Sequence, residues 1–189
     1  MNHISIEGMD GVGKSTTCKL LAEKLGYEFV EKPLHFLFDK DNNSFDEYLR
    51  IRNQVNANPN RDFTSWFYGL GSLYMYEVFR DKSIVTDRHL ASNYAWSGSD
   101  CNKDVYELLV KKLGAPRLTV IIYSPSDVIV KRLISRDKED KDIVRAKQSE
   151  TIYKRMIEFC EMFKFPYIVI DTSKLSPEEV ANRIIEEIK

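Results

Sequence analysis

The chain has 189 residues, a charged fraction of 30%, a hydrophobic fraction of 43% and a formal net charge of −1. These values are typical of a folded domain with its own core, and a net charge near zero gives no reason to expect a nucleic-acid or anionic-membrane partner. No apolar run approaches the roughly 20 residues that span a bilayer, and the first residues do not resemble a signal peptide. We therefore expect a single cytoplasmic domain over residues 1–189, with neither a nucleic-acid nor a membrane partner.

Strand-like and helix-like segments alternate along the chain. Short β-branched or apolar runs predict strands at residues 4–7, 27–31, 84–87, 118–123 and 167–171. Runs of this kind suit strands that are buried on both faces, and helices between them favour parallel pairing. The pattern therefore predicts an α/β fold around a parallel sheet.

Residues 8–15 read GMDGVGKS and match the spacing G-x-x-x-x-G-K-[ST] in full, after a strand and at the start of a helix. Glycines let backbone N–H groups curl around phosphate oxygens, and the helix N-terminus adds about half a positive charge. Lys14 is expected to reach the β- and γ-phosphates of ATP, and the Ser15 hydroxyl to hold Mg²⁺. The ATP-binding residues predicted in this segment are Asp10, Gly11, Val12, Gly13, Lys14, Ser15 and Thr16.

The segment 62–80 predicts a long helix with an apolar face. Its large apolar side chains recur at helical spacing, so we expect them to share one buried face. These residues are Phe63, Phe67, Leu70 and Tyr74.

The fourth predicted strand leads into another helix. Ser124, followed by Pro125, is expected to cap it. The apolar side chains Val130, Leu133 and Ile134 are expected on its buried face, which leaves Arg132 and Arg136 together on the opposite face.

The run 136–142 is charged throughout and has nothing to bury. It can be a solvated loop, or a mobile flap over ATP. Both interpretations are open from the residues alone.

The third predicted strand ends in Asp87, followed at once by Arg88. The carboxyl end of a parallel strand is where ligands bind, so Asp87 is a candidate Mg²⁺ partner, acting through water, as well as a plain strand end. Arg88 offers paired N–H donors to an acceptor phosphate or to the transferred group.

Four segments together resemble the thymidylate kinase family of nucleoside monophosphate kinases: residues 6–16, 87–98, 128–142 and 170–179. The resemblance implies a P-loop kinase fold with five parallel strands in the order 2-3-1-4-5 and helices on both faces. It also implies Mg-ATP as phosphate donor, a small-molecule acceptor and a homodimer.

Position by position, the resemblance also implies roles for single residues. Asp10 would touch the acceptor sugar, and Arg88 would contact the acceptor phosphate or the group in flight. Phe67 and Trp96 would line the acceptor base pocket, although ordinary core packing explains Phe67 equally well.

The lid of the family would correspond to residues 136–142, with Arg132 and Arg136 around it. The phosphate loop of this chain contains no basic residue between Asp10 and Gly13. A lid arginine, Arg136 first, would therefore have to stabilise the transition-state charge.

Two departures concern the acceptor. The family usually has Arg-Glu-Pro after the second strand and an arginine in the long helix, where this chain has Glu31-Lys32-Pro33 and Gly71. Related deoxynucleoside kinases have a glutamate after the second strand that acts as base on a 5′-hydroxyl, a role open to Glu31. We expect a deoxynucleoside monophosphate acceptor, thymidylate (dTMP to dTDP) first. The alternatives are a deoxynucleoside kinase and a nucleotide-binding regulatory ATPase.

Overall fold

The computed structural model describes residues 2–40, 44–140 and 142–189. In this part of the chain, five strands form one sheet in the order β2-β3-β1-β4-β5, with every pair parallel. Both the fold class and the strand order expected from the sequence are confirmed. The strands are β1 (His3–Glu7), β2 (Glu28–Glu31), β3 (Ile84–Asp87), β4 (Leu118–Tyr123) and β5 (Tyr167–Asp171).

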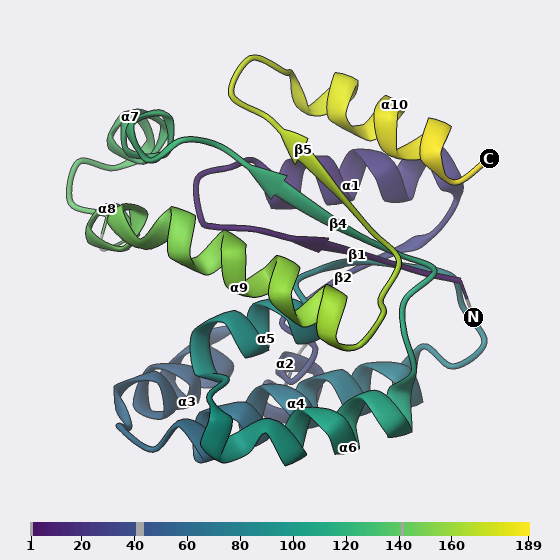
Figure 1. Ribbon diagram of the computed structural model, residues 1–189, viewed down its shortest axis with the longest axis vertical. Helices are drawn as coiled ribbons and strands as arrows, with labels where there is room; N and C mark the ends of the chain where they lie inside the picture. Colours follow the sequence, from purple (N-terminus) through teal and green to yellow (C-terminus); the bar gives the residue numbers. More distant parts are fainter. Residues whose placement is uncertain (1, 41–43, 141) are drawn as a thin grey trace.

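Helices cover both faces of the sheet (Figure 1). Helices α1 and α10 pack together on one face, whereas α5 and α9 pack on the other, with α4 and α6 beyond α5. The helices are α1 (Lys14–Leu25), α2 (His35–Phe38), α3 (Asp46–Ala57), α4 (Arg61–Val78), α5 (Leu90–Ser97), α6 (Lys103–Leu113), α7 (Ser126–Arg136), α8 (Asp142–Arg145), α9 (Ser149–Met162) and α10 (Pro177–Glu187).

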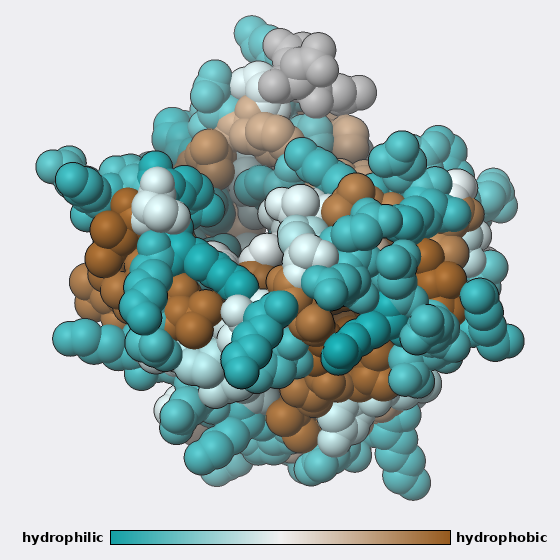
Figure 2. Space-filling view, turned by 90° about the horizontal axis from the view of Figure 1, so that it is seen from above, coloured by the Kyte–Doolittle hydropathy of each residue, from teal (hydrophilic) through white to brown (hydrophobic). Residues whose placement is uncertain are grey.

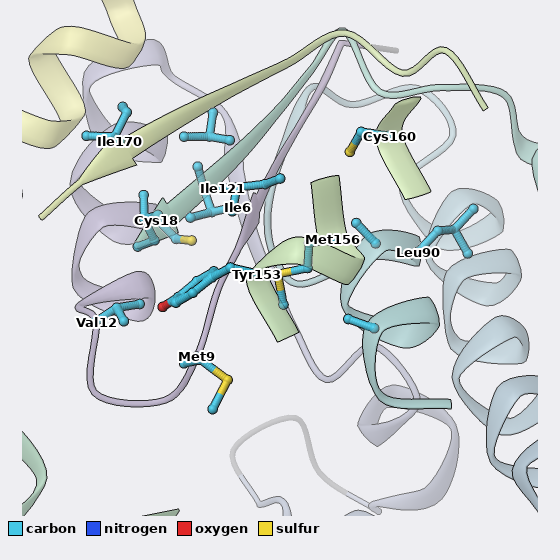
Figure 3. Packing of buried hydrophobic residues seen from close by; sticks show 14 of the residues in the cluster. Ile6, Met9, Val12, Cys18, Leu90, Ile121, Tyr153, Met156, Cys160 and Ile170 are labelled. Atoms are coloured by element: carbon cyan, nitrogen blue, oxygen red, sulfur yellow. The ribbon is translucent and has the colours of Figure 1, made fainter. Parts of the chain in front are cut away.

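The central strands lie in the middle of the main core, which explains their apolar sequences. Ile6 of β1 and Ile121 of β4 have no exposed surface. Figure 3 shows them between Cys18 of α1 and Met156 of α9. Burying such side chains contributes about 1.5–3 kcal/mol each, so the sheet is stabilised mainly from its two faces.

The surface of the molecule is more polar than its core. In the view of Figure 2, hydrophilic side chains surround smaller apolar areas. Within the described residues, no helix is both long and apolar enough to cross a membrane.

The apolar face predicted for α4 is wrong in part. Phe67 is buried, with 9% of its surface exposed, but Phe63 is 50% and Leu70 47% exposed. The helix instead turns a face of small residues inward, because α6 approaches so closely that a Cβ on Gly69 would lie 2.8 Å from Leu109 Cδ1. Besides Phe67 and Gly69, the buried residues of α4 are Thr64, Ser65, Gly71, Ser72 and Met75.

The predicted cap of α7 is also wrong. The helix begins at Ser126, and the Ser124 hydroxyl instead hydrogen-bonds the Thr172 hydroxyl at 2.9 Å. The helix lies at the edge of the fold and buries only a narrow stripe of Ile129 and Leu133, so Ile134 is exposed.

Two buried histidines pack together beneath β1 and β3. The rings of His3 and His89 are 4.8 Å apart, and both lie within 5.6 Å of the Tyr76 ring. His3 hydrogen-bonds the Tyr76 hydroxyl at 2.7 Å and the Thr86 hydroxyl at 2.9 Å. Burial lowers the pKa of His89 to about 3 and holds the pKa of His3 well below its ordinary value.

These histidines should make the protein less stable in mild acid. Unfolded His89 takes up a proton near pH 6.5, whereas the folded form does so only near pH 3, so the free energy of unfolding falls as the pH drops through this window. The loss from His89 alone is about 2 kcal/mol at pH 5. Urea unfolding at pH 7 and pH 5 measures it. His89→Phe should show a clearly smaller difference between the two pH values, and an unchanged difference would contradict this assignment.

Candidate active site

The phosphate loop joins β1 to α1. Gly8, Gly11 and Gly13 all have positive φ, and a Cβ on Gly8 would lie 2.5 Å from the backbone oxygen of Ile122. Only glycine fits this close approach. The Lys14 side chain is buried, donates from Nζ to the Met9 backbone oxygen at 2.8 Å, and so lies inside the loop.

The end of β3 lies beside this loop, as expected of parallel strands. Ser15 Oγ donates to Asp87 Oδ2 at 2.6 Å. A hydroxyl next to a carboxylate suits Mg²⁺, which binds oxygen ligands and keeps several waters. Among the described residues, no group of three or more His, Cys, Asp or Glu could hold a metal, so Mg²⁺ here would take its other ligands from phosphates and water.

Asp10 and Arg88 form the other half of the centre. Arg88 donates from Nη2 to Asp10 Oδ1 at 2.9 Å and from Nη1 to the Gly8 backbone oxygen at 2.8 Å. The charge of Arg88, helped by Lys14, holds the pKa of Asp10 far below its ordinary value, although burial opposes the shift. Burial would lower the pKa of Arg88, but the charges of Asp10 and Asp87 raise it above its ordinary value. The pair is therefore fully ionised at neutral pH.

The backbone at Arg88 is strained. Its φ is 78°, a left-handed conformation that residues other than glycine rarely adopt. Such strain is typical of functional sites and costs on the order of 1–3 kcal/mol. In this conformation the Arg88 guanidinium points back toward the phosphate loop, where it contacts Gly8 and Asp10.

The two lid arginines lie one turn apart on α7, but their side chains have different partners. Arg132 is half-buried and donates from Nη2 to the Thr172 backbone oxygen at 2.7 Å. Arg136 is exposed and pairs with Asp140. In the predicted lid, 136–142, Lys141 lies outside the described residues. The remaining residues form the end of α7, a short turn and the start of α8.

A cavity of about 180 Å³ opens beside the phosphate loop, on the side of Arg132. Its far wall comes from the carboxyl end of β5 and the start of α10, which the sequence analysis did not assign to the site. The rule that ligands bind at the carboxyl ends of parallel strands could have indicated it. The lining residues are Gly11, Val12, Gly13, Thr17, Arg132, Thr172, Leu175, Pro177 and Val180.

Glu31 and Phe67, two of the predicted acceptor residues, do not line this cavity. Glu31 ends β2, beside Asp87 in the sheet register, and pairs with Lys32. Phe67 stacks with Phe38 at 6.3 Å and with Tyr48 at 6.5 Å, within a buried cluster.

Trp96, the remaining acceptor residue, is half-buried on α5. The guanidinium of Arg145 lies 5.9 Å from its ring centre. Arg145 was missed from the sequence, although it lies only three residues after the charged run 136–142. It pairs with Asp142 at 3.1 Å, and its charge also lowers the pKa of Asp10. A basic side chain just beyond the predicted lid therefore contacts Trp96 and acts through its charge on Asp10.

Comparison with known proteins bears on this geometry. A family model described as thymidylate kinase matches residues 6–184, nearly the whole chain. The chain belongs to the thymidylate kinase family. Family membership makes it a nucleoside monophosphate kinase and implies ATP as the phosphate donor.

Proteins similar to this chain differ in the acceptor that their names give. A probable thymidylate kinase of Methanocaldococcus jannaschii is 30% identical and covers 98% of this chain and 95% of its own length. A putative adenylate kinase of Thermococcus gammatolerans is also 30% identical, over 98% of this chain and 85% of its own length. The names of these relatives therefore do not identify the acceptor of this chain, which depends on its own residues.

A solved structure supports the fold. The deoxyadenosine kinase of M. mycoides, described with dCMP and dCDP bound, superposes with a TM-score of 0.64 over 98% of both chains. Its sequence identity is 18%, so the likeness concerns the fold alone.

Proposed function

We propose that this chain is a single kinase domain that transfers the γ-phosphate of Mg-ATP to a deoxynucleoside monophosphate, thymidylate first, giving dTDP. The observation that carries the choice of a monophosphate over a nucleoside is the ion pair between Glu31 and Lys32. The Lys32 ammonium already donates a hydrogen bond to this carboxylate, so the pair would have to open before the oxygen could accept a proton from a hydroxyl. Glu31 is therefore poorly suited to deprotonate a 5′-hydroxyl. A monophosphate acceptor needs no such base, because its own oxygen is already ionised.

On the donor side, backbone N–H groups of residues 11–16 and the Lys14 ammonium bind the phosphates of ATP. Ser15 and Asp87 would hold Mg²⁺, directly or through water, and the ion would supply positive charge between the phosphates. The cavity beside Arg132 is suited to the base of ATP, since it adjoins Gly13 and offers apolar walls.

On the acceptor side, Arg88 binds the acceptor phosphate or the group in flight, and Asp10 accepts a hydrogen bond from the sugar. Asp10 suits this role because its carboxylate stays ionised beside Arg88. Phe67 and Trp96 offer aromatic rings to the acceptor base, from α4 and α5 respectively.

Residues 136–142 form the lid in this proposal, and Arg136 meets the transferring phosphoryl group when the lid closes. Its present partner is Asp140, and in this ion pair the Arg136 side chain is 62% exposed, whereas that of Asp140 is 11% exposed. Because the guanidinium is open to solvent, Arg136 can exchange the carboxylate for a phosphate.

Acceptor preference tests the proposal directly. With purified protein and Mg-ATP, we expect faster formation of dTDP from dTMP than of dTMP from thymidine. Glu31→Gln should leave turnover of dTMP within about threefold of the unmodified protein, because Glu31 takes no proton in this reaction. Product masses and initial rates measure both.

Each alternative function gives a different result. A deoxynucleoside kinase would phosphorylate thymidine faster, and Glu31→Gln would then lower kcat by about 10²–10⁴. A regulatory ATPase would hydrolyse ATP at the same rate with and without an acceptor.

The proposal includes a homodimer. Helix α4 exposes Phe63, Trp66, Leu70 and Leu73, at the 3-4-3 spacing of a helix–helix seam, and Leu108 of α6 is exposed as well. Apolar rows of this kind mark interaction surfaces. The molar mass in solution distinguishes a dimer from a monomer.

We also propose that the protein is located in the cytoplasm, where ATP and deoxynucleotides are available as substrates.

A further inference from the structure

A monophosphate acceptor brings about two negative charges close to those of ATP, and such charge needs more than one cation in a partly buried site. Arg88 alone cannot balance the charge of the acceptor phosphate, because Asp10 already accepts a hydrogen bond from it at 2.9 Å. A second cation should therefore face the acceptor.

Five lysine and arginine residues from the end of β2 to the first residue of α4 are candidates, and contacts exclude two of them. Lys32 is paired with Glu31, and its ammonium lies 4.8 Å from the ring centre of Phe45. Arg50 is exposed and donates twice to Glu47, at 2.6 and 3.0 Å.

Of the other three candidates, Lys40 is exposed and Arg61 is exposed at the first position of α4, whereas Arg52 of α3 is half-buried. Its Nε is buried and, among the described residues, has no hydrogen-bond partner. Its Nη2 donates only to a neutral group, the side-chain oxygen of Asn53 at 2.9 Å. No ion pair that involves Arg52 is found in the described parts of the chain. Arg52 thus has both an unmatched charge and a buried donor without an acceptor, which is unfavourable until an oxygen binds.

Arg52 also lies on the face of α3 that packs against Phe67. It is one helical turn after Tyr48, so both side chains are on the same face of α3. Tyr48 stacks with Phe67, and the next residue, Tyr68, donates to Asn56 of α3 at 2.9 Å. Burial raises the pKa of both tyrosine hydroxyls, and the charges of Arg52 and Arg88 both oppose that rise. The charges of Arg52 and Arg88 therefore act on the same pair of tyrosines, which pack beside Phe67 of the predicted base pocket.

We infer that Arg52 is a second phosphate-binding residue for the acceptor, which it holds together with Arg88. The inference rests on the proposed monophosphate acceptor. The Nε and one Nη of Arg52 would donate side by side to two phosphate oxygens, the geometry in which arginine binds phosphate most strongly. Glu31, whose charge acts on Tyr48 together with that of Arg52, is already paired with Lys32, so the charge of Arg52 is available to the ligand.

The experiment compares Arg52→Ala with Arg50→Ala, a matched control two residues away on α3. Calorimetry without ATP gives the Kd for dTMP and for thymidine, and initial rates give kcat and KM. For Arg52→Ala we expect Kd and KM for dTMP to rise at least about tenfold, the effect of losing a charge-assisted pair of hydrogen bonds. The Kd for thymidine should change less than twofold, and Arg50→Ala should match the unmodified protein. Arg52→Lys, which keeps the charge and the stem, should recover part of the dTMP affinity.

Two results would overturn the inference. One is an equal loss of affinity for dTMP and thymidine in Arg52→Ala, with Arg52→Lys no better, which would make Arg52 a structural residue of α3. The other is unchanged dTMP binding in all three variants. Failure of the proposed function looks different, since the unmodified protein would then bind and phosphorylate thymidine in preference to dTMP.

Discussion

Replacing Lys14 by alanine should lower kcat by about 10²–10³, equivalent to about 3–4 kcal/mol of transition-state stabilisation. The Lys14 ammonium is held inside the phosphate loop by the Met9 backbone oxygen at 2.8 Å, 3.6 Å from the Asp10 carboxylate. From there it would neutralise charge on the transferring phosphoryl group, which alanine cannot do. Initial rates at saturating ATP and acceptor measure the effect.

The matched control is Lys19→Ala, because Lys19 lies on the same helix and is exposed. It should leave kcat within about twofold, and circular dichroism should show both variants folded. A folded Lys14→Ala variant within threefold of the unmodified protein would refute the assignment of the phosphate loop.

The second large effect is expected from Arg136→Ala, which should lower kcat by at least about tenfold and on the order of 10² if Arg136 alone stabilises the transferring group. The KM for ATP should rise much less, because a lid arginine meets the developing charge mainly in the closed complex. Arg136 is exposed and pairs with Asp140, so its removal should cost little stability. Arg136→Lys should recover only part of the rate, since lysine lacks the planar fork.

Two further variants of α7 test whether the loss of kcat is specific to Arg136. Lys131→Ala, at an exposed position of the same helix, should behave as the unmodified protein. Arg132→Ala should act mainly on the KM for ATP, because Arg132 is tied to Thr172 beside the cavity. If neither arginine variant costs tenfold in kcat, the lid hypothesis is wrong, and Arg145, which lies over Trp96, is the next residue to test.

The sequence by itself determined the sheet and the phosphate loop, because both are written in local patterns. Strands buried on both faces need continuous apolar runs, and all five predicted strands are found within one residue of their expected ends. The loop needs glycines at fixed spacing before a helix, so its position was readable without any distant contact. The contact between Ser15 and Asp87 was also foreseeable, since carboxyl ends of parallel strands meet at one edge.

Only the tertiary structure decided which side chains face the site. Arg132 and Arg136 are one turn apart, yet Thr172 of a segment 40 residues away draws the first inward and leaves the second exposed. Helix α4 carries apolar residues on more than one side, and the close approach of Leu109 to Gly69 selects the small face for burial. Arg52 and Arg145 became candidates for the site only through the packing of α3 and α8, which depends on contacts between distant segments. Sequence periodicity reports which faces can be buried, whereas the neighbour that packs against a helix determines which face is.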